Sequence, residues 1–397
     1  MTERQWRGTF RELMAALKVL AALNLALLVS ACTFYTGPPT QQGPIETGQS
    51  GTGGMAAQPT EELDGGEEPN GTWLNVTSNL AGLRSGCGNL ALVSAHPTID
   101  MLVAAVSSRG LWSSTDGGKS WKALGLGALS TPVENVATSI VYDPATPEVF
   151  WETGINGPIG ILETADAGKH FRQRGTSNNH QLLSVDFTDP DRNTQLVGGH
   201  GEKQALLRSR DAGATWDDIG AAFPADADAP SYPLVISDST YLVGAPHQIG
   251  GDSGIYLSTD AGETWDLVSS DGGQSPPLVT SRAIYWSSAE GGGLVKSTDG
   301  GKSFKVLVGP GRLQSFSPIG LPDGKLVAVS ANHIVASADE GATWRFVSAR
   351  LPYAINGFTY SEQQRAFFVW RSTCSGESPV PRNAIMRFDF DYASAGK

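Results

Sequence analysis

The chain has 397 residues, including 48 glycines and ten tryptophans, and only 17% of its residues are charged. Such a composition favours many short strands joined by tight turns over a helical enzyme. The formal net charge of −12 argues against nucleic acids and anionic membrane surfaces as partners, because both attract basic patches.

The first 31 residues are predicted to be a targeting signal. Four basic side chains are followed by an apolar stretch, Val19–Val29, that is too short to span a bilayer. The stretch runs into Leu28–Cys32, which resembles the bacterial lipobox. This resemblance implies that Cys32 carries a lipid, and Thr33 after it favours the outer membrane. An ordinary signal peptide or buried anchor with an incidental cysteine is the alternative.

Residues 32–70 are predicted to be a flexible tether. They contain few large apolar side chains, are rich in Gly, Pro, Thr and Gln, and include an acidic run at residues 61–68. A segment of this kind buries too little apolar surface to offset its chain entropy. It is expected to hold the folded part of the chain away from the membrane.

From residue 71 onward the sequence repeats at intervals of about 40 to 50 residues, the spacing of propeller blades. Six segments share the pattern Ser/Thr-x-Asp-x-Gly-x-x-aromatic: Ser114–Trp121, Thr164–Phe171, Ser209–Trp216, Ser258–Trp265, Ser297–Phe304 and Ser337–Trp344. Their aspartates are Asp116, Asp166, Asp211, Asp260, Asp299 and Asp339. We call these six segments the box turns.

The box turns resemble the Asp-box, or BNR, repeat of β-propellers, and the resemblance covers residues 71–397. It implies a hairpin turn in which the aspartate accepts backbone N–H groups and the glycine adopts a left-handed conformation. The aromatic residue then opens the next strand and packs between neighbouring sheets. Because this family places its boxes on the rim away from the active face, the six aspartates are interpreted as turn-forming residues and none as catalytic.

The number of blades follows from the two ends of the repeating region. Six box turns mark six blades, and Gly357–Tyr392 supplies three further strands with no box and no fourth strand. The segment Gly71–Val76 reads like the sequence that follows each box turn. We therefore predict an all-β, seven-bladed propeller of four-stranded antiparallel blades, in which the N-terminal strand completes the last blade and closes the ring.

The two remaining cysteines are predicted to form a disulfide. Cys87 falls in the loop that enters blade one, and Cys374 falls between the second and third strands of blade seven. Both loops lie on the same face of neighbouring blades, and an exported domain allows the bond to persist. Two free thiols are the alternative.

Ligands of propellers usually meet the face formed by the loops that enter each blade and those that join its second and third strands. In the second set of loops the candidate ligand-binding residues are Arg109, Asn156, His200, His247, Glu290, His333 and Arg371. His180 lies in the loop that enters blade three. These side chains are predicted to surround the central channel with polar groups suited to a sugar or peptide; loops that are simply polar are the alternative.

No metal site or cofactor is predicted. The face histidines come from separate blades without a short ligand spacing. The pair Asp226 and Asp228 lacks the graded oxygen pattern of a calcium loop, so a solvated acidic loop is the preferred interpretation.

The family resemblance requires a test for sialidase activity. Sialidases hold a substrate carboxylate with three arginines and use a Tyr–Glu pair and an Asp for the chemistry. Their first arginine lies in a Phe/Tyr-Arg-Ile-Pro motif, whereas the corresponding region here contains Arg84 in Leu-Arg-Ser-Gly. Arg109, Arg312 and Arg371 are available to converge, but no Tyr–Glu pair matches that of the family.

Other relatives widen the choice. Glycosidases of this architecture need two carboxylates, for which Glu134, Glu202 and Glu290 are face candidates on different blades. Xyloglucan-hydrolysing relatives have two propellers, and this chain has one. The photosystem II assembly factor, another relative, binds a protein subunit without catalysis.

The sequence therefore favours a monomeric bacterial cell-envelope propeller, held on the membrane by its lipid alone, that binds a protein or glycan ligand without assignable catalysis. An exo-acting, sialidase-like glycoside hydrolase is the competing hypothesis.

Overall fold

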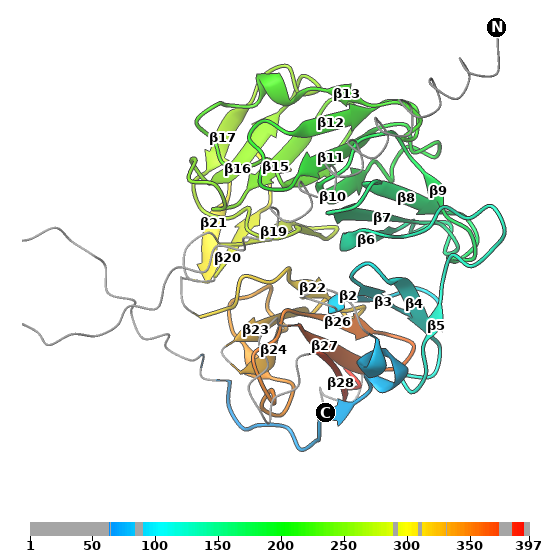
Figure 1. Ribbon diagram of the computed structural model, residues 1–397. Coiled ribbons are helices and arrows are strands. Elements are labelled where there is room, and N and C mark those ends of the chain that lie inside the picture. Colours follow the sequence, from blue (N-terminus) through cyan, green and yellow to red (C-terminus); the bar gives the residue numbers. More distant parts are fainter. Residues whose placement is uncertain are drawn as a thin grey trace, which may run out of the picture. The chain divides into compact units, whose positions relative to one another are not determined.

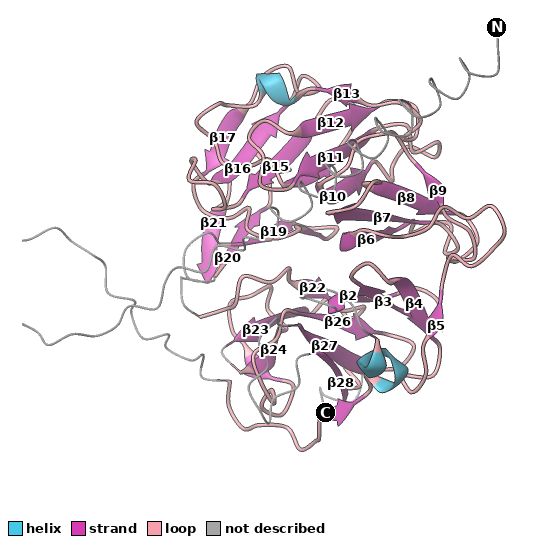
Figure 2. Cartoon of the chain, in the orientation of Figure 1, coloured by secondary structure: helices cyan, strands magenta, loops and turns pink. Residues whose placement is uncertain are grey.

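The computed structural model describes Leu63 and residues 65–83, 90–288, 293–308, 312–330, 332–372 and 383–392. Seven four-stranded antiparallel sheets follow one another around a ring (Figure 1). Helical structure in these residues is confined to two short 3-10 turns, η1 (Ser78–Gly82) and η2 (Gly220–Ala222) (Figure 2). The predicted seven-bladed, all-β architecture is confirmed.

Each blade has an inner strand, two middle strands and a short outer strand, in that order along the chain for blades one to six. Blade one contains β2 (Leu90–Ala95), β3 (Leu102–Val106), β4 (Gly110–Ser114) and β5 (Lys122–Ala123). Blade two contains β6 (Val136–Tyr142), β7 (Phe150–Ile155), β8 (Ile161–Thr164) and β9 (Arg172–Gln173). Blade three contains β10 (His180–Val185), β11 (Gln195–Gly199), β12 (Leu206–Ser209) and β13 (Asp217–Asp218).

The remaining blades follow the same plan. Blade four contains β14 (Tyr232–Val235), β15 (Tyr241–Ala245), β16 (Gly254–Ser258) and β17 (Asp266–Ser269). Blade five contains β18 (Leu278–Val279), β19 (Ile284–Ser287), β20 (Leu294–Ser297) and β21 (Lys305–Val308). Blade six contains β22 (Ile319–Gly320), β23 (Leu326–Ser330), β24 (His333–Ser337) and β25 (Arg345–Phe346). Blade seven contains β26 (Gly357–Ser361), β27 (Ala366–Ser372), β28 (Asn383–Asp389) and β1 (Leu74–Asn75).

The second strand of a blade is apolar on both sides because a neighbouring blade covers each side. In β3, Leu102 and Ala104 belong to a core shared with blade seven, while Val103 and Ala105 belong to a core shared with blade two. All four side chains are at most 2% exposed. Burial of a Leu or Val side chain stabilises the fold by about 1.5–3 kcal/mol, so the seams between blades carry much of the stability.

Blade seven is built from both ends of the propeller sequence. Its outer strand β1 pairs antiparallel with β28, with Leu74 opposite Arg387 and Asn75 opposite Met386. The pairing continues beyond β1, where the Val76 N–H donates to the Ile385 carbonyl at 2.9 Å and the Ile385 N–H donates to Thr77 Oγ1 at 2.8 Å. The predicted closure by the N-terminal strand is therefore confirmed.

The six box turns share one hydrogen-bond pattern. In the first, the Ser120 N–H and the Ser114 hydroxyl donate to Asp116 Oδ1 at 3.0 and 2.8 Å, and the Ser120 hydroxyl donates to Oδ2 at 2.6 Å. Gly118 has a φ of +83°, the left-handed region that glycine adopts without strain. The side chain of Asp116 is thus engaged within its own turn, as the sequence predicts.

A short segment before β1 packs on the propeller, although the sequence places it in the tether. Leu63 is only 9% exposed and joins the core between blades five and six. The Phe346 N–H donates to the Gly65 carbonyl at 2.9 Å, and His333 Nε2 donates to Glu68 Oε1 at the same distance. We call Leu63 and residues 65–70 the strap. The acidic composition suggested disorder, but Leu63, the Gly65 carbonyl and Glu68 each contact the ring.

Cys32, the predicted lipidation site, and the cysteines Cys87 and Cys374 lie outside the described residues, so the anchor and the disulfide stay predictions. Among the described residues, no helix is long and apolar enough to cross a membrane.

Candidate functional site

The two faces of the ring differ in what their loops do. Because the strands of each blade alternate in direction, the connections from the third to the fourth strand, which hold the box turns, lie on one face. The connections that enter each blade and those that join its second and third strands lie on the other, which we call the open face. The candidate ligand-binding residues belong to this face.

The structure presents most of these candidates to solvent. Arg109, Asn156, His200 and His247 are exposed, Arg371 is half-buried, and His333 is buried. Glu290 lies outside the described residues.

On the open face, two polar side chains of blade three are linked. His200 Nδ1 donates to Gln181 Oε1, which comes from the inner strand β10. Burial lowers the pKa of His200, opposed by the nearby Glu202 carboxylate, and burial raises the pKa of Tyr232. Near pH 7 both groups are therefore neutral hydrogen-bonding partners, which suits amide and hydroxyl ligands.

Two further candidates are positioned through their backbone. The Asn156 N–H donates to Asn179 Oδ1 at 3.1 Å, and Asn156 has a φ of +56°, which places its side chain at the tip of a tight turn. The His247 N–H donates to Gln274 Oε1 at 3.3 Å, a contact from blade four to the loop that enters blade five. The Asn156 amide and the His247 imidazole are thereby held at the open face.

The loop that carries His247 is fixed by Asp228. This carboxylate is fully buried and accepts the N–H groups of Ile249, Gly250 and Gly251 at 3.0 to 3.1 Å. The preferred interpretation of this region as a solvated acidic loop is therefore wrong for Asp228, whose charge is neutralised by backbone dipoles. No cluster of three or more potential metal ligands occurs among the described residues.

Arg371 is held on the open face by two contacts. Its guanidinium lies over the Tyr353 ring, 5.6 Å from the ring centre, and Nη1 donates to the Ala354 carbonyl at 3.1 Å. Arg109, by contrast, projects from the short β3–β4 turn, whose geometry is set by a 2.8 Å hydrogen bond from its N–H to the Val106 carbonyl.

His333 and His180 are structural rather than exposed. His333 is 2% exposed, its ring lies 4.2 Å from that of Phe346, and it pairs with Glu68 of the strap. The sequence placed it on the open face, but β24 begins at this residue and turns its side chain into the blade. Burial lowers the pKa of His180 to about 4, and Ser177 Oγ lies 2.9 Å from its Nε2.

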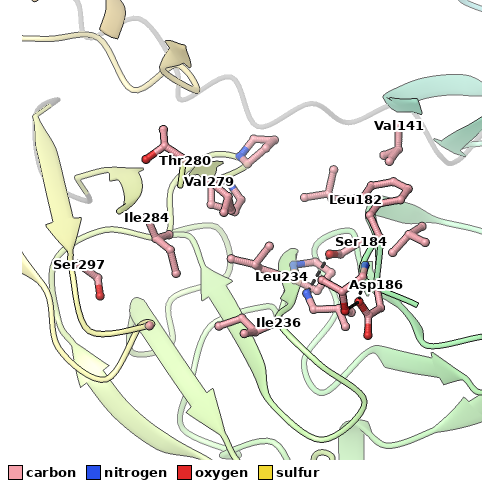
Figure 3. A pocket seen from close by; sticks show the side chains of 18 of the residues that line it. Val141, Leu182, Ser184, Asp186, Leu234, Ile236, Val279, Thr280, Ile284 and Ser297 are labelled. Atoms are coloured by element: carbon pink, nitrogen blue, oxygen red, sulfur yellow. Dashed lines mark hydrogen bonds between the residues drawn. The ribbon is translucent and has the colours of Figure 1, made fainter. Parts of the chain in front are cut away.

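A cavity of about 740 Å³ is lined by the inner strands β6, β10 and β14 and by residues of blade five. Figure 3 shows aliphatic side chains on its wall, including Leu182, Leu234 and Ile236, with Asp186 and Thr280 toward its edge. None of the seven candidate residues from the sequence lines this cavity. The lining also includes residues 186–188 after β10, residues 280–283 after β18 and part of the box turn that begins at Ser297, so the cavity lies toward the box-turn face.

Sequence reasoning missed Gln181, which hydrogen-bonds His200. It also missed Glu152, a fully buried glutamate in β7 whose Oε2 accepts from Asn135 Nδ2 at 3.2 Å. A signal existed for Glu152, since a charged residue within the run Phe150–Ile155 interrupts an otherwise buried strand.

No protein-family model matches the chain. A xyloglucanase from Paenibacillus sp. is 27% identical over 242 residues, which cover 58% of this chain and 22% of the relative. The chain thus spans about a fifth of the length of the curated relative it matches.

Solved structures share the fold at low sequence identity. The GH74 enzyme of Niastella koreensis has a TM-score of 0.54 and 16% identity, covering 75% of this chain and 52% of the other. YCF48 bound to D1 peptide has a TM-score of 0.51 and 13% identity, covering 83% of this chain and all of the other. The extracellular domain of the two-component system BT3049 from B. thetaiotaomicron has a TM-score of 0.52 and 12% identity, covering 76% and 40%.

Proposed function

We propose that this chain is a cell-envelope propeller that binds a protein or glycan ligand across its open face. The observation that carries the proposal is the hydrogen bond between His200 and Gln181 on the open face. Their uncharged hydrogen-bonding groups suit the amide and hydroxyl groups of a peptide or glycan. YCF48, a protein of the same fold, is known in complex with a peptide.

Binding arrays test this proposal. Detergent-solubilised full-length chain is screened against a peptide array and a glycan array, together with the His200→Ala and Gln181→Ala variants. Lys119→Gln, on the box face, is the matched control. We expect the two open-face variants to lose at least tenfold in affinity for the ligands found, while the control retains wild-type affinity. If the wild type and all three variants bind the ligands with equal affinity, His200 and Gln181 are not part of a ligand site.

The second candidate function is glycoside hydrolysis, favoured by the similarity to a xyloglucanase over 242 residues. Xyloglucan is the substrate to test first, followed by a fluorogenic sialoside, with release of reducing sugar or fluorophore as the measurement. If the wild-type chain turns over either substrate and Glu202→Gln or Glu290→Gln abolishes this activity, the chain is a glycoside hydrolase and the proposal of binding without catalysis is wrong. Absence of turnover on both substrates favours the binding proposal.

We also propose that Cys32 is lipidated and retains the propeller at a bacterial membrane. The lipobox-like sequence Leu28–Cys32 supports this. Cells that express the chain incorporate labelled palmitate into it, and the Cys32→Ala variant loses the label. Unchanged labelling of the variant refutes the anchor.

A further inference from the structure

The cavity between the inner strands of blades two, three and four is not part of the ligand site proposed on the open face. Its described lining comes from β6, β10 and β14, from blade five and from the loops that follow β10 and β18, and it lies toward the box-turn face (Figure 3). Its volume of about 740 Å³ is within the range of pockets that hold small organic molecules. Four blades thus contribute walls to a space of suitable size for a small ligand.

The walls of this cavity are mainly aliphatic. Leu182 of β10 and Leu234 of β14 line it from neighbouring blades, and Ile236 extends the apolar surface beyond β14. Leu234 and Ile236 are only half-buried, and Val279 of β18 is 54% exposed although it belongs to the lining. Because removing apolar surface from water is favourable, these side chains can stabilise the apolar part of a ligand.

Most polar side chains of the described lining already have partners within the protein. Ser184 Oγ accepts a backbone N–H of β14 at 2.9 Å, and Thr280 Oγ1 donates to a backbone carbonyl at 3.0 Å. The Arg282 guanidinium forms an ion pair of 3.2 Å with a carboxylate of the sixth box turn. Ser281 and Thr298 add hydroxyl groups on exposed residues. A sugar would leave several of its hydroxyl groups unpaired between these walls, so the lining favours a ligand with few polar groups.

Asp186 differs from these residues because it brings a carboxylate to the lining without a cation. The residue is 6% exposed, and its Oδ1 accepts the Thr188 N–H at 2.9 Å and the Thr188 hydroxyl at 2.6 Å. All the hydrogen bonds that Asp186 receives from the described residues end on Oδ1, and it forms no ion pair with them. A buried charge without a partner is unfavourable, so a cation in the cavity would be stabilised beside Asp186.

The charges around Asp186 also favour a cation. Arg192 interacts electrostatically with Asp186, but it donates two hydrogen bonds, of 2.8 and 3.0 Å, to Asp143. Asp189 adds another carboxylate close to the same guanidinium. One positive charge therefore stands against three negative ones, and the resulting negative potential attracts cations.

We propose that this cavity binds a small molecule with an apolar body and a protonated amine. The aliphatic walls contact the apolar body, and the Asp186 carboxylate accepts a charge-assisted hydrogen bond from the ammonium group. A neutral molecule of the same shape makes only the apolar contacts, and an anionic one is repelled. Because the cavity lies toward the box-turn face, this site is separate from the ligand site proposed on the open face.

Three probes of similar shape test the preference for an amine: adamantylmethylamine, adamantylmethanol and adamantane carboxylate. Each is titrated by calorimetry into the full chain in a non-ionic detergent, and its heat of transfer into detergent alone is subtracted. We expect the amine to bind the wild type at least tenfold more tightly than the alcohol, and the carboxylate to bind most weakly. This comparison needs no variant.

Two charge-matched variants test the role of Asp186. Asp186→Asn keeps an acceptor for the Thr188 hydrogen bonds and removes the charge. The control Asp266→Asn removes the same charge from an exposed residue of the outer strand β17. We expect Asp186→Asn to lose at least tenfold in affinity for the amine and less than twofold for the alcohol. The control should lose less than twofold for both probes.

Two further variants place the apolar body of the probe. Leu234→Gln puts a polar group into the wall, so we expect it to bind both the amine and the alcohol at least fivefold more weakly. The control Leu267→Gln makes the same change at a leucine of β17 that is 51% exposed, and should leave both affinities within twofold of the wild type. If the melting temperature shows that Leu234→Gln folds poorly, Val279→Gln replaces it, because Val279 is exposed.

Four outcomes overturn the proposal. The first is equal affinity of the wild type for the amine and the alcohol, and the second is an equal loss of amine affinity in Asp186→Asn and Asp266→Asn. The third is unchanged affinity in Leu234→Gln, which would place the probes elsewhere on the chain. The fourth is that no probe binds. If in that case a peptide with a lysine between leucines binds and depends on Asp186, the cavity accepts a protein side chain rather than a small molecule.

Discussion

The Glu152 carboxyl group is fully buried, and its surroundings favour the protonated form. Its Oε1 and the Asn135 Oδ1 are both buried acceptors without hydrogen-bond partners, while Asn135 Nδ2 donates to Glu152 Oε2. Burial raises the pKa of Glu152 to about 8. A protonated carboxyl satisfies this arrangement, since its O–H is a donor in a place where only acceptors remain.

Glu152 therefore makes the protein less stable as pH rises. The pKa is raised on folding, so the folded state binds the proton more tightly, and stability falls from about pH 4.5 to about pH 8. The Glu152→Gln variant keeps a hydrogen-bond donor at this position and removes the carboxyl group that titrates. We expect it to raise the free energy of unfolding by about 3 kcal/mol at pH 7 and by much less at pH 5. Urea titrations at both pH values measure this, with exposed Glu148→Gln as the control. If the unfolding free energies of Glu152→Gln and the wild type differ by the same amount at pH 5 and pH 7, this prediction is wrong.

The box aspartates have the opposite pH dependence. Hydrogen bonds from the Ser120 side chain and backbone lower the pKa of Asp116 to about 2, and Thr343 does the same for Asp339. Their contribution to stability is present above the ordinary aspartate pKa and is lost as pH falls through about 2. We expect Asp116→Asn to have a lower melting temperature than the wild type at pH 6. This difference in melting temperature should be smaller at pH 2.5. A gap that stays constant from pH 6 to pH 2.5 shows that the turn does not depend on the charge.

At the scale of single elements, the strap is anchored to the ring through Leu63, Gly65 and Glu68. Leu63→Ala removes its apolar anchor from the core between blades five and six, at a cost of about 2 kcal/mol. Because the loss is local, we expect faster opening of the strap rather than unfolding of the ring. Glutamyl endopeptidase, which cuts at Glu67 and Glu68, should cleave the variant at least tenfold faster than the wild type. Leu126→Ala, at an 80% exposed leucine, is the control. Equal cleavage rates mean that Leu63 does not hold the strap.

The elements differ in how well the sequence predicts them. The box turns fix the blade period because their conformation depends on local residues, such as Asp116 and Gly118, and the sequence around Trp73 identifies the closing strand. The direction of a side chain is harder to predict, because a strand placed one residue too early or too late has every side chain on the wrong face. His333 was assigned to a loop but is the first residue of β24, and its ring lies inside the blade. The pairing of Gln181 with His200 depends on contacts between strands that periodicity does not encode.

At the scale of the whole molecule, stability depends on the junction between the two ends of the propeller sequence. Thr77→Val leaves the buried Ile385 N–H without its acceptor at nearly constant volume. We expect a loss of about 1–3 kcal/mol in the free energy of unfolding, measured by urea titration followed by tryptophan fluorescence. Thr72→Val, at an exposed residue of the same segment, should change it by less than about 0.5 kcal/mol. A loss of similar size in both variants means that the closing bond is not the cause.

The shared seventh blade also sets an order of events during biosynthesis. Among the strands, β1 leaves the ribosome first, yet its partner β28 is made more than 300 residues later. Until then the early blades have an uncovered flank, and the first strand has no sheet to join. A chain that stops short of residue 383 never acquires that partner. Completion of the ring therefore requires that the chain has been made through β28, and termination before that strand leaves blade seven with an unpaired edge.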